Sequence, residues 1–149
     1  MKQLNPLAKE GKINEDANVR DRQSIIINSP TENVWKLLAD VEDWQHWNHD
    51  IKIDRYSSTE EGETFKWQIK GHSILSTFQK VDAPRLLAWT SKSQMQKAVN
   101  VWKLENAGNQ TIVSVEVSVQ GLSTFFYSHQ KLHSSLLSWL SRLKLKAES

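Results

Sequence analysis

Alternating apolar and polar positions predict a run of β-strands through the middle of the chain. In segment 64–70 the odd positions are apolar and the even positions are polar, which is the period of a strand with one buried face. Comparable segments follow at 73–81, 85–91, 97–104 and 111–119. Because the connections between them are short, Gly71-His72 among them, the pattern predicts an antiparallel meander with one face toward water.

A run of three isoleucines predicts a first strand over residues 23–28. The segment that follows has the composition of a capping box, with Ser29 as N-cap, Pro30 as the first helical residue and Glu32 three residues after the cap. Asp40 is then predicted to cap a second short helix. Two short helices are therefore expected directly after the first strand.

The chain ends in a predicted amphipathic helix that runs to about Lys146, with Ser123 or Thr124 as its cap. Its apolar stripe, with members three or four residues apart, consists of Phe125, His129, Leu132, Leu136, Leu140 and Leu143. A helix of this length must bury such a stripe, and the sheet is the only large surface available for it. We therefore expect the helix to pack on the sheet.

Composition limits the classes of protein that this chain can form. Its 149 residues suit one domain, predicted over residues 21–149, and the polar, aperiodic residues 1–20 are predicted to form an extended arm. The absence of cysteine excludes disulfides, thiolate metal sites and cysteine nucleophiles. Residues 1–20 carry no apolar run and no later stretch is long enough to span a membrane, so we expect a cytoplasmic protein.

The net charge of +2 at pH 7 is concentrated near the C-terminus. Residues 121–149 carry four basic residues and one acidic residue, whereas residues 21–120 are slightly acidic. A nucleic-acid-binding surface normally needs a clustered basic face. Basic residues such as Arg142 and Lys146 instead suit the negative end of a helix dipole, so we expect no nucleic-acid partner.

Several short motifs, taken in their order along the chain, indicate a family. They are Ile25 to Pro30, Val34-Trp35, Asp40 to Trp44, Trp47-Asn48, Gly62 to Trp67, Ser76-Thr77, Leu87-Ala88-Trp89, Val101-Trp102, Gly121 and Trp139-Leu140. Together they cover about residues 21–147 and resemble the START-like helix-grip superfamily (SRPBCC), in particular its polyketide cyclase/dehydrase-like branch. The resemblance implies an α+β fold in which a curved antiparallel sheet grips the C-terminal helix, with an apolar cavity between them. Members bind lipids, sterols, polyketides or other apolar molecules, and some are cyclases or dehydratases.

The side chains on the inner face of the sheet are the ones that would line such a cavity. Pairing the last two strands sets Trp102 near Val113 and Asn100 near Val115, and turns the valines of the last strand inward. The candidate ligand-binding residues are Trp44, Trp47, Phe65, Trp67, Phe78, Trp89, Asn100, Trp102, Val115, Val117, Phe126, His129 and His133. Such linings are typical of small-molecule pockets, but the same side chains would also suit a filled core. The two tryptophans of the second short helix either wall the entrance or clamp the short helices onto the sheet.

His129 and His133 are the most distinctive polar pair, because residues four apart lie on one face of a helix. Three roles stay open for them: metal binding, contact with a ligand, or plain structural use. Zinc normally needs a third protein ligand, which His46 or His49 would have to supply. Buried polar groups need hydrogen-bond partners in any case. We predict no metal site and no cofactor.

Three functions are consistent with these residues. The leading hypothesis is binding of an apolar small molecule, lipid-, polyketide- or aromatic-like, in the cavity. The second is a cyclase or dehydratase that uses the same cavity, with His129 or His133 as general acid or base. Relatives in the branch often carry a histidine where Asn100 stands and an acidic residue where Val117 stands, which argues against transferring that chemistry. The third is a protein-interaction module with a vestigial cavity, which would use the basic C-terminal end or exposed tryptophans such as Trp139.

Overall fold

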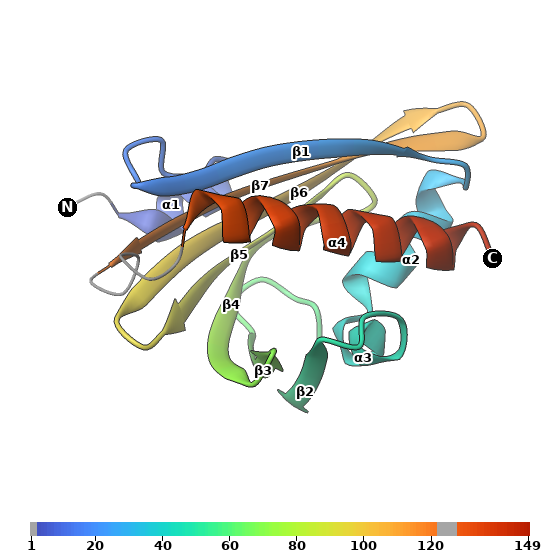
Figure 1. Cartoon of the computed structure of the whole chain (residues 1–149). Helices are drawn as coiled ribbons and strands as arrows, with labels where there is room; N and C mark the ends of the chain where they lie inside the picture. Colours follow the sequence, from blue (N-terminus) through green and yellow to red (C-terminus); the bar gives the residue numbers. More distant parts are fainter. Residues whose placement is uncertain (1–2, 122–127) are drawn as a thin grey trace.

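One curved antiparallel sheet, with a long helix inside its curve, organises the computed structural model (Figure 1). The structure describes residues 3–121 and 128–149. In chain order its elements are α1 (Leu4–Lys9), β1 (Val19–Ile27), α2 (Thr31–Ala39), η1 (Val41–Asp43), α3 (Trp44–Trp47), β2 (Ile51–Arg55), β3 (Thr64–Ile69), β4 (His72–Asp82), β5 (Leu86–Ser93), β6 (Gln96–Ala107), β7 (Gln110–Gly121) and α4 (His129–Ala147). The predicted α+β helix-grip fold is confirmed.

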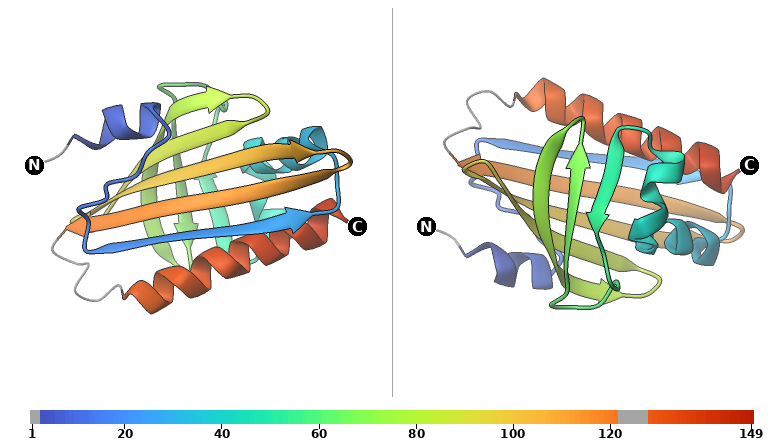
Figure 2. Two further views of the ribbon diagram at one scale, coloured as in Figure 1. Left: turned by 90° about the horizontal axis from the view of Figure 1, so that it is seen from above. Right: turned by 90° about the horizontal axis from the view of Figure 1, so that it is seen from below.

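The strands follow the order β1-β7-β6-β5-β4-β3-β2, and every neighbouring pair is antiparallel. Helix α4 runs beside β1, while β2, β3 and β4 bend round to enclose its other side (Figure 2). The sequence pattern does not predict β2, because this strand has only five residues and directly follows the short helices. Its place at the edge of the sheet completes the curve around α4.

The β6–β7 hairpin is tighter than the sequence pattern predicts. Ala107 pairs with Gln110, so that the turn consists of Gly108 and Asn109 instead of a six-residue loop. Gly108 has a φ of 73°, a left-handed conformation that two-residue hairpin turns need and that glycine adopts without strain. The two strands are therefore paired over their whole length.

Because the turn is tighter, the observed register of β6 against β7 differs by two residues from the predicted one. Trp102 pairs with Val115, not with Val113, and Asn100 pairs with Val117, not with Val115. A shift by two residues leaves each side chain on its original face of the sheet. The valines of β7 therefore still point inward, as predicted, and Val113, Val115 and Val117 are all buried.

The capping box predicted at Ser29 does not form. Helix α2 begins at Thr31, its N-cap is Pro30, and no side chain makes a capping hydrogen bond. Ser29 is buried, and its Oγ accepts a hydrogen bond from Asn33 Nδ2 at 2.6 Å. The carbonyl oxygen of Ser29 accepts another from Thr111 Oγ1 at 2.8 Å. This bond to β7 holds Ser29 outside the helix, so the helix starts one residue later than its sequence suggests.

The N-terminal segment covers the outer face of the sheet, and the predicted extended arm is wrong for Leu4–Lys9, which form α1. A small apolar cluster lies under this helix. It consists of Ala8, Ile13, Ala88, Val99 and Val101. The backbone N–H of Asn14 also donates to Ser118 Oγ at 3.1 Å. The six residues of α1 are too few for a helical period to be recognised in the sequence.

Aromatic rings fill the part of the interior next to the C-terminal half of α4. The ring centroid of Trp44 lies 5.1 Å from that of Trp139, 5.4 Å from that of Trp89 and 5.7 Å from that of Phe65. Two of these three contacts are edge-to-face, which is a favourable arrangement of aromatic quadrupoles. The Nε1–H of Trp44 donates to the carbonyl oxygen of Leu38 at 2.9 Å. This aromatic core joins α3, the sheet and α4.

Helix α4 begins at His129, with Ser128 as its N-cap; Ser128 Oγ accepts a hydrogen bond from the backbone N–H of Lys131 at 3.1 Å. The predicted caps, Ser123 and Thr124, lie outside the described residues. The four leucines of the predicted stripe, Leu132, Leu136, Leu140 and Leu143, are buried. Among the helices that the structure describes, none combines the length and the hydropathy that a membrane crossing requires.

Polar contacts also hold the C-terminal half of α4. Arg142 Nη1 donates to Asp50 Oδ2 at 2.9 Å and also to Asn48 Oδ1. Lys144 Nζ donates to the carbonyl oxygen of Ile26 at 2.9 Å. These bonds tie the helix to the segment between α3 and β2 on one side and to β1 on the other.

Gly121, at the end of β7, passes close to the β5–β6 turn. Its φ is 126°, and a Cβ at this position would collide with the carbonyl oxygen of Met95 and lie 3.0 Å from Gln96 Cα. We expect Gly121→Ala to lower the free energy of unfolding by about 3 kcal/mol. Gly108→Ala is the control, since Gly108 also has a positive φ but no atom within 4 Å of the added Cβ; it should cost about 1 kcal/mol. Urea unfolding measures both, and equal losses would contradict the steric argument.

Candidate functional site

The described residues leave a space in the interior beside the N-terminal half of α4. A pocket of about 940 Å³ lies there between the helix and the sheet. Trp67, Trp102 and Trp139 form its floor, where their rings also contact the aromatic core. The apolar walls above this floor are Ile69, Ile74, Ala98, Val117, Val119, Leu132 and Leu136.

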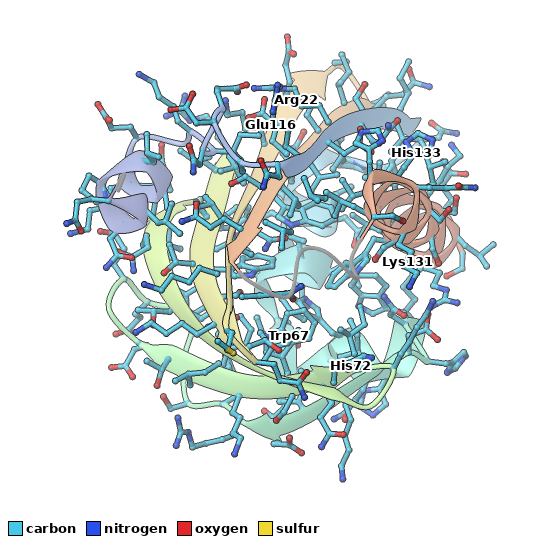
Figure 3. All side chains as sticks on the ribbon, turned by 60° about the vertical axis from the view of Figure 1, so that its left-hand side comes forward. Arg22, Trp67, His72, Glu116, Lys131 and His133 are labelled. Carbon is cyan, nitrogen blue, oxygen red and sulfur yellow. The ribbon has the colours of Figure 1, made fainter. Side chains whose placement is uncertain are left out.

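The pocket opens at one end of the sheet, where the β3–β4 and β5–β6 turns approach the first turn of α4. Its rim includes Lys70 from the first turn, His72 from the start of β4, Gln94 from the second turn and Lys131 from the helix. In the view along α4, Lys131 lies across the opening from His72, and Trp67 lies on the sheet behind them (Figure 3). The pocket therefore runs from a polar rim to a tryptophan floor.

Ser91 lines the pocket and ends a hydrogen-bond chain that comes from the core. Trp67 Nε1–H donates to Ser76 Oγ at 3.0 Å, and Ser76 Oγ lies 2.7 Å from Ser91 Oγ. Ser76 is fully buried and accepts from Trp67, and in its bond with Ser91 either hydroxyl can be the donor. Asn100, half-buried in the same lining, adds a carboxamide.

The predicted ligand-binding residues divide into two groups. Trp67, Asn100, Trp102 and Val117 line the pocket. The others that are described on the sheet and short helices, Trp44, Trp47, Phe65, Phe78, Trp89 and Val115, are buried in the core beside it and do not line the pocket. Phe126 lies outside the described residues. Contact of any of these side chains with a ligand stays a prediction.

Trp44 and Trp47 clamp the short helices onto α4 and do not wall the pocket entrance. The ring of Trp47 lies 5.9 Å from that of Trp139, and both Trp44 and Trp47 are buried. The expectation of an exposed Trp139 is wrong, because this side chain is only 6% exposed and forms part of the pocket floor. Its spacing of three residues from Leu136 is the signal that places it in the apolar stripe.

His129 and His133 point away from the pocket, toward Asp21 on β1. His133 Nδ1 lies 3.0 Å from Asp21 Oδ2, and His129 Nε2 lies 3.8 Å from Asp21 Oδ1. The side chains of His129 and His133 are 66% and 42% exposed, so the assignment of His129 to the apolar stripe is wrong. His129, three positions before Leu132, lies at the margin of the apolar stripe. Its side chain faces the edge of β1 and the solvent.

The environment of Asp21 lowers its pKa. Burial raises the pKa of this carboxyl, which is 10% exposed, but hydrogen bonds from Gln23, His133 and the backbone N–H of Arg22 outweigh that effect and hold the pKa below its usual range. Gln23 Nε2 donates to both carboxylate oxygens, at 3.1 and 3.3 Å, and also lies 2.8 Å from His133 Nδ1. The carboxylate therefore joins β1 to the first turns of α4.

The histidines proposed as a third metal ligand are not near this pair. His46 belongs to α3 and its Nδ1 contacts Asp43, and His49 follows α3 in the same segment. Within residues 3–121 and 128–149, no group of three or more His, Cys, Asp or Glu side chains is arranged to hold a metal ion. His129 and His133 both lie near Asp21 at the edge of the sheet, and the choice between ligand contact and structural use stays a prediction.

Comparison with known proteins agrees with this architecture. The model of a family described as polyketide cyclase / dehydrase and lipid transport matches residues 19–131. Among curated proteins there is no match.

Solved structures show the same fold. Protein CV1439 from Chromobacterium violaceum has a TM-score of 0.76 at 12% identity, over 88% of this chain and 99% of that one. The hypothetical protein jhp0584 from Helicobacter pylori has a TM-score of 0.74 at 13% identity, over 89% and 90%. A START superfamily protein from Mycobacterium smegmatis has a TM-score of 0.71 at 13% identity, over 87% and 97%. At these identities the likeness concerns the fold alone.

Asp21 should make stability depend on pH. Because its pKa is lower in the folded than in the unfolded chain, its contribution is complete above about pH 4 and is lost as the pH falls through the folded-state value. We expect Asp21→Asn to lower the free energy of unfolding by about 1 kcal/mol near neutral pH. The difference from the unmodified protein should fade on acidification below about pH 4.

Urea unfolding at a series of pH values checks this expectation. Asp40→Asn is the matched control, since Asp40 is exposed and its side chain makes no capping hydrogen bond. A loss for Asp21→Asn that is as large in acid as at neutral pH would show that the ionised carboxylate is not the stabilising species.

Proposed function

Because the chain belongs to the polyketide cyclase / dehydrase and lipid transport family, we propose that it binds an apolar small molecule in the pocket between the sheet and α4. The observation that carries this proposal is the tryptophan floor. Three indole rings, of Trp67, Trp102 and Trp139, meet at the inner end of a space of about 940 Å³. A large apolar concavity with a few polar groups is the usual form of a small-molecule site.

The positions of the candidate acid and base favour binding over the cyclase or dehydratase alternative. A general acid or base has to reach the reacting atom within hydrogen-bond distance, directly or through one water. His129 and His133 are turned to Asp21 at the edge of the sheet, and Asn100 and Val117 stand in the pocket itself. A reaction through these two histidines therefore has no support from the geometry.

The interaction-module alternative is weakened by the burial of Trp139. That side chain was its candidate surface contact, and it belongs instead to the pocket floor. The basic C-terminal end is also engaged within the chain, since Lys144 Nζ contacts Glu148 Oε2 at 2.7 Å. Both observations support a role for the interior of the fold.

Titration with N-phenyl-1-naphthylamine, a neutral apolar fluorophore, tests the proposal. We expect saturable binding with one site per chain, and energy transfer from the pocket tryptophans. Ala98→Trp should weaken binding about tenfold or more, because Ala98 lines the pocket and a bulky ring there occupies its volume. Ala107→Trp is the control on the same strand, since Ala107 is exposed and does not line the pocket.

The comparison of the two variants decides the outcome. Equal binding by Ala98→Trp and Ala107→Trp would place the fluorophore outside the pocket, and no saturable binding at all would contradict the proposed function. Circular dichroism of both variants establishes that each has kept its fold.

A further inference from the structure

The charges around the pocket are unequal. Among the described residues of its lining, three are lysines, Lys70, Lys97 and Lys131, and one is acidic, Asp50. Asp50 is already engaged by a cation, because Arg142 Nη1 lies 2.9 Å from its Oδ2. The lining therefore carries an excess of positive charge.

The positive charge is confined to one end of the pocket. Lys70 lies in the β3–β4 turn, and Lys131 lies in the first turn of α4. Both are exposed, as is His72, which lies across the opening from Lys131 (Figure 3). At the other end the floor is built from indole rings. The pocket is therefore polarised along its length, with cations at the rim and apolar surface at the base.

Hydrogen-bond donors continue inward from the cationic rim. Ser91 lies two residues before the end of β5 and lines the pocket, and its hydroxyl shares a hydrogen bond with Ser76 in which either group can be the donor. The carboxamide of Asn100 adds a further donor to the same lining. A ligand with acceptor oxygens at the end nearest the rim satisfies these groups, whereas a cationic ligand meets like charge there.

We infer that the ligand of this pocket is an amphipathic anion, with a carboxylate head at Lys70 and Lys131 and an apolar body that reaches the tryptophan floor. This inference rests on the proposed function and adds the chemical class of the ligand. Charge-assisted hydrogen bonds from lysine hold the carboxylate, and burial of the apolar body against Trp67, Trp102 and Trp139 supplies most of the affinity.

Three ten-carbon probes with the same tail separate the contribution of the head from that of the body. Decanoate, decanol and decylammonium are titrated as competitors of N-phenyl-1-naphthylamine, below the concentrations at which they form micelles. We expect decanoate to bind about tenfold more tightly than decylammonium, with decanol between them, at low ionic strength. The preference for decanoate over decanol should shrink in about 500 mM salt, which screens exposed charges.

A double variant, Lys70→Gln with Lys131→Gln, tests the residues. It should weaken decanoate binding about fivefold and leave decanol binding unchanged, because exposed ion pairs contribute modestly each. Lys66→Gln with Lys146→Gln is the matched control, on the same strand-turn unit and the same helix. Both of these lysines are exposed and lie outside the pocket lining.

The possible failures are distinguishable. Decanol binding that equals decanoate binding at low salt would overturn the inference and leave the proposed function intact. A loss of decanol binding in the Lys70/Lys131 variant, equal to the loss of decanoate binding, would also overturn it, since the lysines would then act on the shape of the pocket. Failure of all three probes to compete would instead count against the proposed function.

Discussion

The burial of the apolar side of α4 inside the curve of the sheet is the constraint on which the rest of the structure depends. Trp139 makes the central contact, since its ring packs edge-to-face on Trp44 at 5.1 Å and also contacts Trp47 of the short helix α3. The short helices, the sheet and α4 are therefore held by one aromatic core. Because the large rings of the described residues are concentrated in one half of the interior, these residues close that half and leave the pocket in the other.

The aromatic core also has a cost in unpaired polar groups. The indole N–H groups of Trp47, Trp89 and Trp102 are buried without a hydrogen-bond partner among the described residues, and an unsatisfied donor of this kind costs about 1–3 kcal/mol. Trp44 and Trp67 avoid this cost by donating to Leu38 and Ser76. The large apolar area of each indole ring offsets the loss.

The fold could be predicted from the sequence where periodicity extends over many residues. The alternation of β3 and the leucine stripe of α4 specify both a structure and its buried face, and the family motifs specify the order of elements. Periodicity does not reveal α1 or β2, because each is only five or six residues long. The capping pattern misplaces the start of α2, because a bond from Thr111 on β7 to the carbonyl oxygen of Ser29 outweighs the local capping preference.

The candidate site could be predicted only in part. The periodicity of the sequence shows that a side chain points to the interior, but it does not show whether that side chain lines the pocket or packs on another ring. Phe65 and Trp67 share one face of β3, yet only Trp67 lines the pocket. The helical spacing of His129 is compatible with the apolar stripe, but its side chain lies toward Asp21 at the edge of β1, so spacing alone does not predict its position. The rim lysines come from a turn and a helix start, where no pattern marks a shared site.

The two ends of α4 are held with very different strength, which has a mechanical consequence. At the C-terminal end the helix is fixed by buried rings and by the bonds of Arg142 and Lys144. At its first turns, the described side-chain contacts with β1 include those of the exposed His129 and the half-exposed His133 with Asp21. Separating α4 from the sheet therefore requires less free energy at the N-terminal end of the helix than at its C-terminal end. The aromatic core is therefore the fixed point of the helix, and the pocket lies beside the half of the helix that is less strongly held.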